Sequence, residues 1–291
     1  EGVAIQDDGR IVVAGTWDGW PERGFIVARF NSDGTPDTSF GVDGAFEVSF
    51  GSLEAAVGGM ALAPDGKIVV VGSHGSTFGG ATVDIAIARL NADGSLDATL
   101  GGDGTVTTTI GGTEGRARAV AVHPDGRIVV AGSSRLLRYS ADGSLDPDFG
   151  DGGVAMIPNA TWGYGLALQP DGRVIVAWGG YFGSDDPDVA VGRFDPDGEL
   201  DALSITDFGE AGVRTTDIAE AVAIQADGKI VAAGSGGTWC SNCRWALARY
   251  TALRPNLRLA ATPPSVDFGV VVAGTLGQAT VDVSNPSSTS S

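Results

Sequence analysis

A short motif rich in side-chain oxygens recurs four times in this chain of 291 residues, and oxygens at such spacing could bind a cation. Each copy reads Asn, Ser or Asp followed by x-Asp-Gly-x-x-Asp, and the copies span residues 31–37, 91–97, 140–146 and 195–201. Ca²⁺ favours oxygen ligands at alternate positions, but a calcium-binding loop has its glycine at position six and ends on a bidentate Glu, which these copies lack. Asn and Asp also close turns through their own side chains. We therefore expect turns here, with no metal and no cofactor, and Ca²⁺ binding stays the alternative.

One arginine stands at the same place in five similar apolar stretches, and a guanidinium could bind an anionic ligand. The five residues are Arg29, Arg89, Arg138, Arg193 and Arg249. A ring of such cations would suit an anion, but a partly buried arginine also needs a carboxylate partner. Because a residue that is equivalent in every unit more often serves the repeat than a single site, we expect an ion pair with an Asp of the nearby turns.

The two cysteines lie three positions apart, as Cys240 and Cys243, directly after Trp239. A redox enzyme would need the first thiol at a helix N-terminus, where its pKa is lowered. A zinc site would need further Cys or His ligands at suitable spacing, and the sequence offers none. We expect a local disulfide that closes a loop of a secreted protein.

Residues for acid–base or nucleophilic catalysis are sparse. The only histidines are His74 and His123, and neither has a neighbouring motif of known chemistry. Loop carboxylates that could serve glycoside hydrolysis, which needs two facing carboxyl groups, are Asp18, Glu22, Asp185, Asp186 and Asp188. Acidic loops are expected at this composition, and nucleophile-elbow, Walker and dinucleotide-binding motifs are absent from the sequence. We predict no catalytic residue.

Composition limits the class of protein that must position these residues. The formal net charge is −18, which argues against a nucleic-acid partner because phosphate binding needs a basic face. The 46 Gly and 13 Pro residues disfavour helices. No apolar run reaches the length of a membrane span, so we expect no membrane insertion. The chain opens without an initiator Met or a signal-like segment, as an internal fragment or processed product would.

Internal repetition gives the architecture. Five Asp-Gly turns precede apolar runs such as IVVVG (68–72), and their glycines are Gly9, Gly66, Gly126, Gly172 and Gly228. An apolar stretch precedes each turn, and a stretch like IAIARL (85–90) follows after a variable loop. Four units then continue through a second Asp-Gly turn, towards a Thr/Val-rich stretch. We name the four expected strands of a unit A, B, C and D. An all-β propeller of five four-stranded repeats fits this pattern better than a β-solenoid, whose rungs are shorter.

The succession PDGKIVVVG and DIAIARLNADGSLDATLGGDGTV resembles the bacterial delta-60 repeat, a family of uncharacterised function expected to form β-propellers. The resemblance covers about residues 1–252 and implies the fold and an extracellular bacterial setting, but no catalytic residues. The third unit departs from the pattern because only Ser133 and Ser134 separate strands B and C, and the fourth has extra residues around 204–207. We expect the propeller at 1–254, with repeats at about 1–53, 54–113, 114–160, 161–217 and 218–254.

The C-terminal stretch is of another kind. Residues 257–286 are similar to the opening of immunoglobulin-like bacterial surface domains, although they are too few for a complete sandwich. We expect a partial immunoglobulin-like β segment at 255–286 and a Ser-rich linker at 287–291. Open strand edges near 265–284 predict pairing with a second chain or with the rest of such a domain.

The expected strand order puts the variable B–C and D–A connections at one face, and aromatic residues gather in or beside them. They are Trp17, Trp20, Trp162, Tyr164, Trp178, Tyr181, Phe182 and Trp239. Such rings suit a glycan or a protein ligand, unless they pack under the loops instead. We predict an extracellular or cell-surface binding, adhesion or scaffold module without catalytic activity. The alternative is a propeller enzyme acting on a polysaccharide. In the binding module, Trp20→Ala or Trp178→Ala would remove binding and leave the thermal midpoint nearly unchanged.

Overall fold

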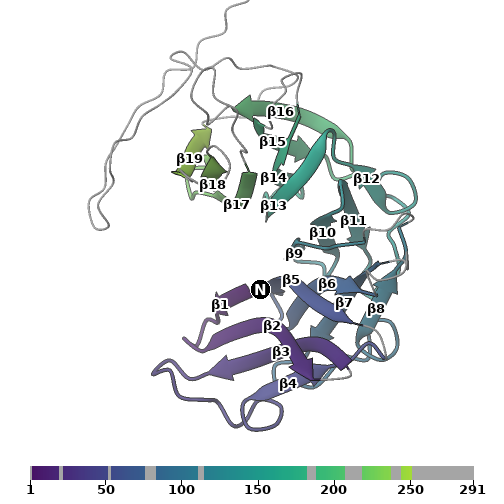
Figure 1. Cartoon of the computed structure of the whole chain (residues 1–291), viewed down its shortest axis with the longest axis vertical. Helices are drawn as coiled ribbons and strands as arrows, with labels where there is room; N and C mark the ends of the chain where they lie inside the picture. The colour runs from purple at the N-terminus through teal and green to yellow at the C-terminus, as the bar shows by residue number, and fades with distance from the viewer. Residues whose placement is uncertain are drawn as a thin grey trace, which may run out of the picture. The chain divides into compact units, whose positions relative to one another are not determined.

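The computed structural model describes residues 2–19, 22–51, 54–75, 83–110, 115–181, 188–206, 218–236 and 244–250. Within these residues the chain forms 19 β-strands and no helix, so none of its described elements is a helix that could cross a membrane (Figure 1). The all-β prediction is confirmed.

The strands form five antiparallel sheets in chain order, which we call blades 1 to 5. Blade 1 contains β1 (Gly2–Ile5), β2 (Ile11–Gly19), β3 (Glu22–Phe30) and β4 (Ala45–Val48). Blade 2 contains β5 (Ala55–Leu62), β6 (Ile68–His74), β7 (Asp84–Leu90) and β8 (Thr105–Thr108). Blade 3 contains β9 (Ala119–Val122), β10 (Ile128–Gly132), β11 (Arg135–Tyr139) and β12 (Val154–Met156).

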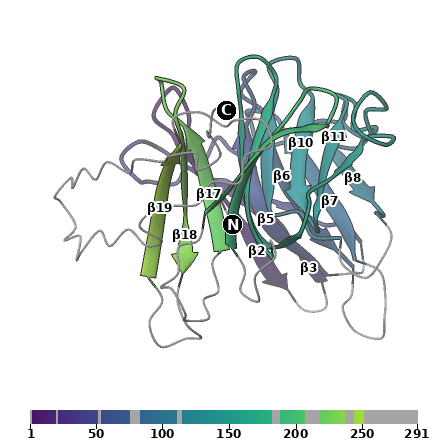
Figure 2. The same cartoon turned by 90° about the horizontal axis from the view of Figure 1, so that it is seen from above.

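Blade 4 contains β13 (Ala160–Leu168), β14 (Val174–Gly180), β15 (Asp188–Phe194) and β16 (Leu200–Thr206). Blade 5 contains β17 (Ile218–Ile224), β18 (Ile230–Gly236) and β19 (Arg244–Tyr250), which lie side by side in Figure 2. The described residues hold three strands of blade 5, and the segment 255–291 lies outside them, so the predicted C-terminal β segment, its linker and its strand pairing are not tested.

The Asp-Gly turns between strands A and B form as the sequence predicts. In blade 2 the amide of Gly66 donates to the carbonyl of Ala63, and Asp65 accepts a hydrogen bond from the amide of Lys67. Gly66 has a φ of 84°, a left-handed value that costs glycine little. The same amide-to-carbonyl hydrogen bond closes the A–B turns at Gly9, Gly126 and Gly228. Because each of these turns needs the same residue types, the repeat is visible in the sequence.

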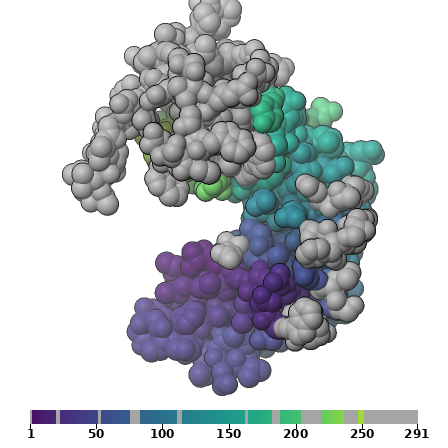
Figure 3. Space-filling model, viewed as in Figure 1, coloured from purple at the N-terminus to yellow at the C-terminus, as the bar shows by residue number. Residues whose placement is uncertain are grey.

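The core lies between neighbouring blades, because strand B is apolar on both faces. In β6, Ile68 and Val70 pack towards blade 1, whereas Val69 and Val71 pack towards blade 3. All four side chains are fully buried. The first two blades form a continuous surface in Figure 3. Fully apolar strands of this kind are expected where sheets are stacked on both sides.

The chain divides into two compact units. The first holds blades 1 to 3 together with residues 170–172 and 196–199, and the second holds the rest of blades 4 and 5. On one face of blade 1, Val3, Ile5 and Val13 are exposed. The equivalent residues of blade 2, such as Met60 and Val70, pack against blade 1. Blade 1 therefore retains an unfilled blade-docking face within its own unit.

Candidate functional site

The arginine of strand C is bonded to both its own blade and the next. In blade 2, Arg89 Nε lies 2.6 Å from a carboxylate oxygen of Asp97, and Nη2 donates to the Thr99 hydroxyl at 2.9 Å. Nη1 donates to the Ala141 carbonyl of blade 3 at 2.8 Å. Arg89 and Asp97 are each 5 % exposed. A buried guanidinium is tolerated only when it is paired and hydrogen-bonded in this way.

The same arrangement recurs, and we call it the Arg–Asp cluster of a blade. Arg29 binds Asp37 at 2.8 Å and the carbonyl of Ala92 in blade 2. Arg138 binds Asp146 at 2.7 Å and the carbonyl of Pro196 within the same compact unit, and Arg193 binds Asp201 at 2.9 Å. The predicted structural ion pair is thus confirmed for these four arginines. Arg249 is exposed, and it forms no ion pair within the described part of the chain.

A second cation, which the sequence analysis did not assign, joins each cluster from the A–B turn. Lys67 Nζ lies 3.3 Å from Asp97, and Arg10 Nε lies 3.2 Å from Asp37. Hydrogen bonds from the Ser39 hydroxyl and Arg29 lower the pKa of Asp37 to about 2. Burial alone would raise the pKa of Asp97, but the bonds from Thr99 and Arg89 outweigh it and lower that pKa. The signal in the sequence was the basic residue that follows the glycine of every A–B turn.

The oxygen-rich motifs are closed turns. Asp93 Oδ1 accepts from the Ser95 amide at 2.9 Å and from its hydroxyl at 2.6 Å, and Asp33 and Asp142 bond Thr35 and Ser144 alike. The turn interpretation is confirmed. Among the residues that the structure describes, no three His, Cys, Asp or Glu side chains are grouped so that they could hold a metal ion.

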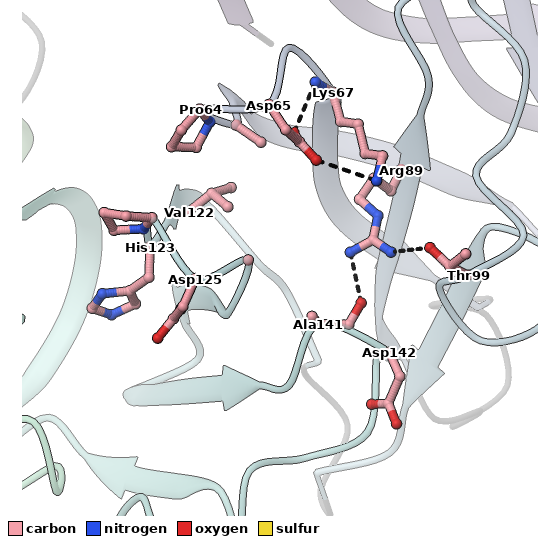
Figure 4. Close-up of a pocket in the computed structure, with 13 residues that line it drawn as sticks. Pro64, Asp65, Lys67, Arg89, Thr99, Val122, His123, Asp125, Ala141 and Asp142 are labelled. Atoms are coloured by element: carbon pink, nitrogen blue, oxygen red, sulfur yellow. Dashed lines mark hydrogen bonds and ion pairs between the residues drawn. The ribbon is translucent and has the colours of Figure 1, made fainter.

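A cleft of about 440 Å³ lies in the first unit, where the A–B turns of blades 2 and 3 meet (Figure 4). Its walls include Pro64, Lys67, Arg89, Thr99, His123 and Asp125. His123 is 4 % exposed, and its Nε2 atom is buried without a hydrogen-bond partner. Burial lowers the pKa of His123, and the charge of Arg127 lowers it further. The lowered pKa favours the neutral imidazole, and its buried Nε2 atom is not accessible from solvent.

Two of the three carboxylates that line this cleft are bonded to cations. Asp65 lies 3.2 Å from Lys67 Nζ, Asp125 accepts from Arg127 Nε at 2.8 Å, and Asp142 accepts from the Ser144 hydroxyl at 2.7 Å. The bond from Arg127 lowers the pKa of Asp125, although burial opposes it. A general acid in glycoside hydrolysis needs the opposite, a raised pKa. The lining carboxylates Asp65, Asp125 and Asp142 therefore lack the raised pKa that a general acid needs.

The predicted aromatic set divides into buried and accessible side chains. Trp178 is fully buried and Tyr164 is 6 % exposed, so both belong to the core and their assignment to a ligand surface is wrong. The Trp178 ring fills the space beside Gly192 of β15, where an added Cβ would lie 2.8 Å from it. Trp17 is half-buried and lies at the end of β2 rather than in a loop. Tyr181, at 44 % exposure, is accessible.

The remaining predicted residues are only partly described. Trp162 lies in β13, as expected beside the D–A connection, and Asp18 is bonded to Arg23 at 2.9 Å. The residues of the predicted site, the disulfide and the loop carboxylates that fall outside the described part of the chain are Trp20, Phe182, Trp239, Cys240, Cys243, Asp185 and Asp186. Their predicted roles are not tested.

Comparison with solved structures finds similar chains at low identity. One is a protein of unknown function from Bacteroides caccae, 13% identical, with a TM-score of 0.48, over 79% of this chain and 69% of that chain. Another is virginiamycin B lyase from Staphylococcus aureus, 13% identical, with a TM-score of 0.40, over 84% and 83%. A third is a gluconolactonase from Xanthomonas campestris, 15% identical, with a TM-score of 0.43, over 85% and 71%. No curated protein matches the sequence.

A family model described as a domain of unknown function (DUF5122) beta-propeller matches five segments, namely residues 6–40, 63–100, 123–149, 169–203 and 225–252. Each segment runs from the end of strand A in one blade through its A–B turn and strands B and C. Together the segments make up more than half of the chain. The chain therefore belongs to the DUF5122 β-propeller family.

Proposed function

We propose that this chain is a non-catalytic binding or scaffold module, acting outside the cell or at its surface, that binds a glycan or protein ligand on the loop side of its blades. The loop side is the side from which the B–C and D–A connections leave a blade, and the turn side carries the A–B and C–D turns. The extracellular setting rests on the resemblance to secreted bacterial repeats and on the cysteine pair in a loop.

The observation that supports this proposal most is that the connections on the loop side vary in length, whereas the A–B turns on the turn side do not. The A–B turns have one length, as at 6–10, 63–67 and 123–127, and their charged residues are bonded into the Arg–Asp clusters. The B–C connections range from the two residues Ser133 and Ser134 to the nine residues 75–83. Ligand-binding residues tend to lie on variable loops that a rigid scaffold positions.

The alternative function, an enzyme acting on a polysaccharide, receives less support. Such an enzyme needs two facing carboxyl groups, one of them with a raised pKa. Asp65 and Asp125, which line the cleft described above, are bonded to Lys67 and Arg127, and these bonds lower their pKa although burial opposes them. His123 remains the residue whose replacement would test catalysis in that cleft.

The experiment is a titration of the purified chain against a panel of neutral and acidic polysaccharides, with calorimetric binding and product release measured on the same samples. We expect binding without product, and we expect Tyr181→Ala to weaken it because Tyr181 is an exposed ring on the loop side of blade 4. Val42→Ala is the matched control, since Val42 is 76% exposed in the C–D connection of blade 1. Product release that His123→Ala abolishes would overturn the proposal in favour of an enzyme.

A further inference from the structure

Three arginines of blade 3 form no ion pair with any described residue, whereas most of the other described cations are bonded to carboxylates. Arg116 and Arg118 are exposed and Arg135 is half-buried, and none of them forms an ion pair within the described residues. By contrast, Arg10, Arg23, Lys67, Arg127 and Lys229 on the surface each bind an Asp. In a chain of net charge −18, leaving three guanidiniums free of carboxylates needs an explanation.

The three arginines meet at the loop side of blade 3, around the turn of Ser133 and Ser134. The amide of Arg116 donates to the Ser133 hydroxyl at 2.8 Å, and Nη1 of Arg135 donates to the Ser133 carbonyl at 3.4 Å. Arg118 bonds the Ala131 carbonyl through its amide at 2.8 Å. The side chains of Arg116 and Arg118 are exposed, whereas Ala117 between them is buried.

The short B–C turn is what brings these residues together. Ser133 and Ser134 have φ values of 50° and 60°, in the left-handed region that non-glycine residues avoid. Two such residues in a two-residue turn hold β10 and β11 in a tight hairpin. Backbone strain of this kind persists where the surrounding structure fixes it, and it is concentrated at functional sites.

The repeat itself does not require these arginines. At the position of Arg118 the register places Gly58, Tyr164 and Glu220 in blades 2, 4 and 5. At the position of Arg135, three residues before the arginine of the Arg–Asp cluster, the other blades carry Ile26, Ala86, Ala190 and Ala246. A cation that occurs in one blade only serves that blade and not the fold.

We propose that Arg116, Arg118 and Arg135 form a binding patch for the oxyanions of an acidic polysaccharide, either carboxylates or sulfates. The planar fork of a guanidinium matches both groups, and three unpaired cations gain most from an anionic ligand. The inference rests on the proposed function, because it assigns the ligand of the loop side. A protein partner fits less well, because protein interfaces need an apolar centre. Among the described residues, Met156, which pairs with Arg135 across two strands, is the one large apolar side chain exposed beside the patch.

The negative charge of the whole chain adds selectivity. An anionic ligand is repelled by most of this surface, so it is attracted to the three arginines, which pair with no carboxylate of the described residues. Such electrostatic guidance weakens with salt, because mobile ions screen exposed charges beyond about 10 Å at 0.1 M. Binding at this patch is therefore expected to fall as the salt concentration rises.

The test compares polygalacturonate, dextran sulfate, poly-glutamate and uncharged dextran for binding to the full chain at 50 mM and 300 mM NaCl. The variant R116Q/R118Q/R135Q removes the patch, and R10Q/R23Q/K229Q removes the same charge from paired surface residues elsewhere. We expect the wild type to bind a polyanion in a salt-dependent manner. The patch variant should bind it at least tenfold more weakly, and the control variant within twofold of the wild type. Thermal midpoints within 2 °C of the wild type would show that both variants fold.

Equal losses in both variants, or no binding of either polyanion by the wild type, would overturn the inference. Binding of poly-glutamate in preference to both polyanions would show that the ligand is an acidic polypeptide and would overturn it as well. Binding of a neutral glycan that depends on Tyr181 would leave the proposed function standing in each of these cases. The two proposals can therefore fail separately.

Discussion

Replacing Asp97 with Ala removes the carboxylate at the centre of the blade 2 cluster, and its cost can be worked from the contacts. Asp97 binds Arg89 at 2.6 Å and Lys67 at 3.3 Å, and both Asp97 and Arg89 are 5 % exposed. Removing one partner of a buried pair leaves an uncompensated charge and typically costs about 3–5 kcal/mol. Arg89 also tethers blade 2 to the Ala141 carbonyl of blade 3, so the loss affects the junction of the two blades.

The assay is urea unfolding followed by tryptophan fluorescence, with Asp18→Ala as the matched control. Asp18 pairs with Arg23 at 2.9 Å, but both side chains are roughly half exposed, and such solvent-screened pairs contribute little to stability. We expect Asp97→Ala to lower the free energy of unfolding by several times more than Asp18→Ala. If Asp97→Ala does not fold, Asp97→Asn, which keeps the size of the side chain, provides the measurement. Equal effects of the Asp97 and Asp18 variants would refute the reasoning.

Four further predictions follow from the same structure. Hydrogen bonds from Ser39 and Arg29 lower the pKa of Asp37 to about 2, against an ordinary 3.8, so the stability that the Asp37 carboxylate contributes is complete above pH 4 and is lost as the pH falls towards 2. A series of thermal midpoints measured against pH checks this. An Asp37→Asn variant with the same acid dependence as the wild type would contradict it. Trp178→Ala should destabilise by about 3–5 kcal/mol, since a fully buried ring is lost; unchanged unfolding would restore Trp178 as a surface residue. Gly94→Ala should destabilise by more than about 1 kcal/mol, because φ is +90° and the new Cβ would lie 2.7 Å from the Gly41 amide of blade 1; a neutral effect would argue against that blade junction. Thiol labelling of natively isolated protein should find no free thiol at Cys240 or Cys243, and labelling of both would count against the disulfide and the secreted setting.

The blades could be predicted well from the sequence because each blade repeats the same turn and the same apolar strand. The Asp-Gly turn fixes where strand B begins, and the apolar strand B requires sheets on both sides. The pairing of Arg89 with Asp97 was also predictable, since both residues recur at a fixed spacing. The bond from Arg89 to the Ala141 carbonyl was not predictable, because main-chain acceptors on a neighbouring blade leave no pattern in side-chain identity.

The position of Trp178 shows which sequence signal was overlooked. Trp178 stands where strand B of the other blades has a glycine, such as Gly72, and Gly192 stands where strand C of blade 2 has Ala88. The structure places the ring of Trp178 beside Gly192, so a small residue compensates for a large one across two strands. An exchange of this kind predicts local packing, whereas a tryptophan near a loop, considered alone, suggested a ligand surface.

The most direct test of the central claim is one titration of the purified chain with an acidic polysaccharide, in which heat of binding and released product are recorded from the same sample. The account predicts saturable binding with no product over many hours, and loss of that binding in R116Q/R118Q/R135Q but not in R10Q/R23Q/K229Q. Product that accumulates with the wild-type chain and disappears with His123→Ala would contradict it.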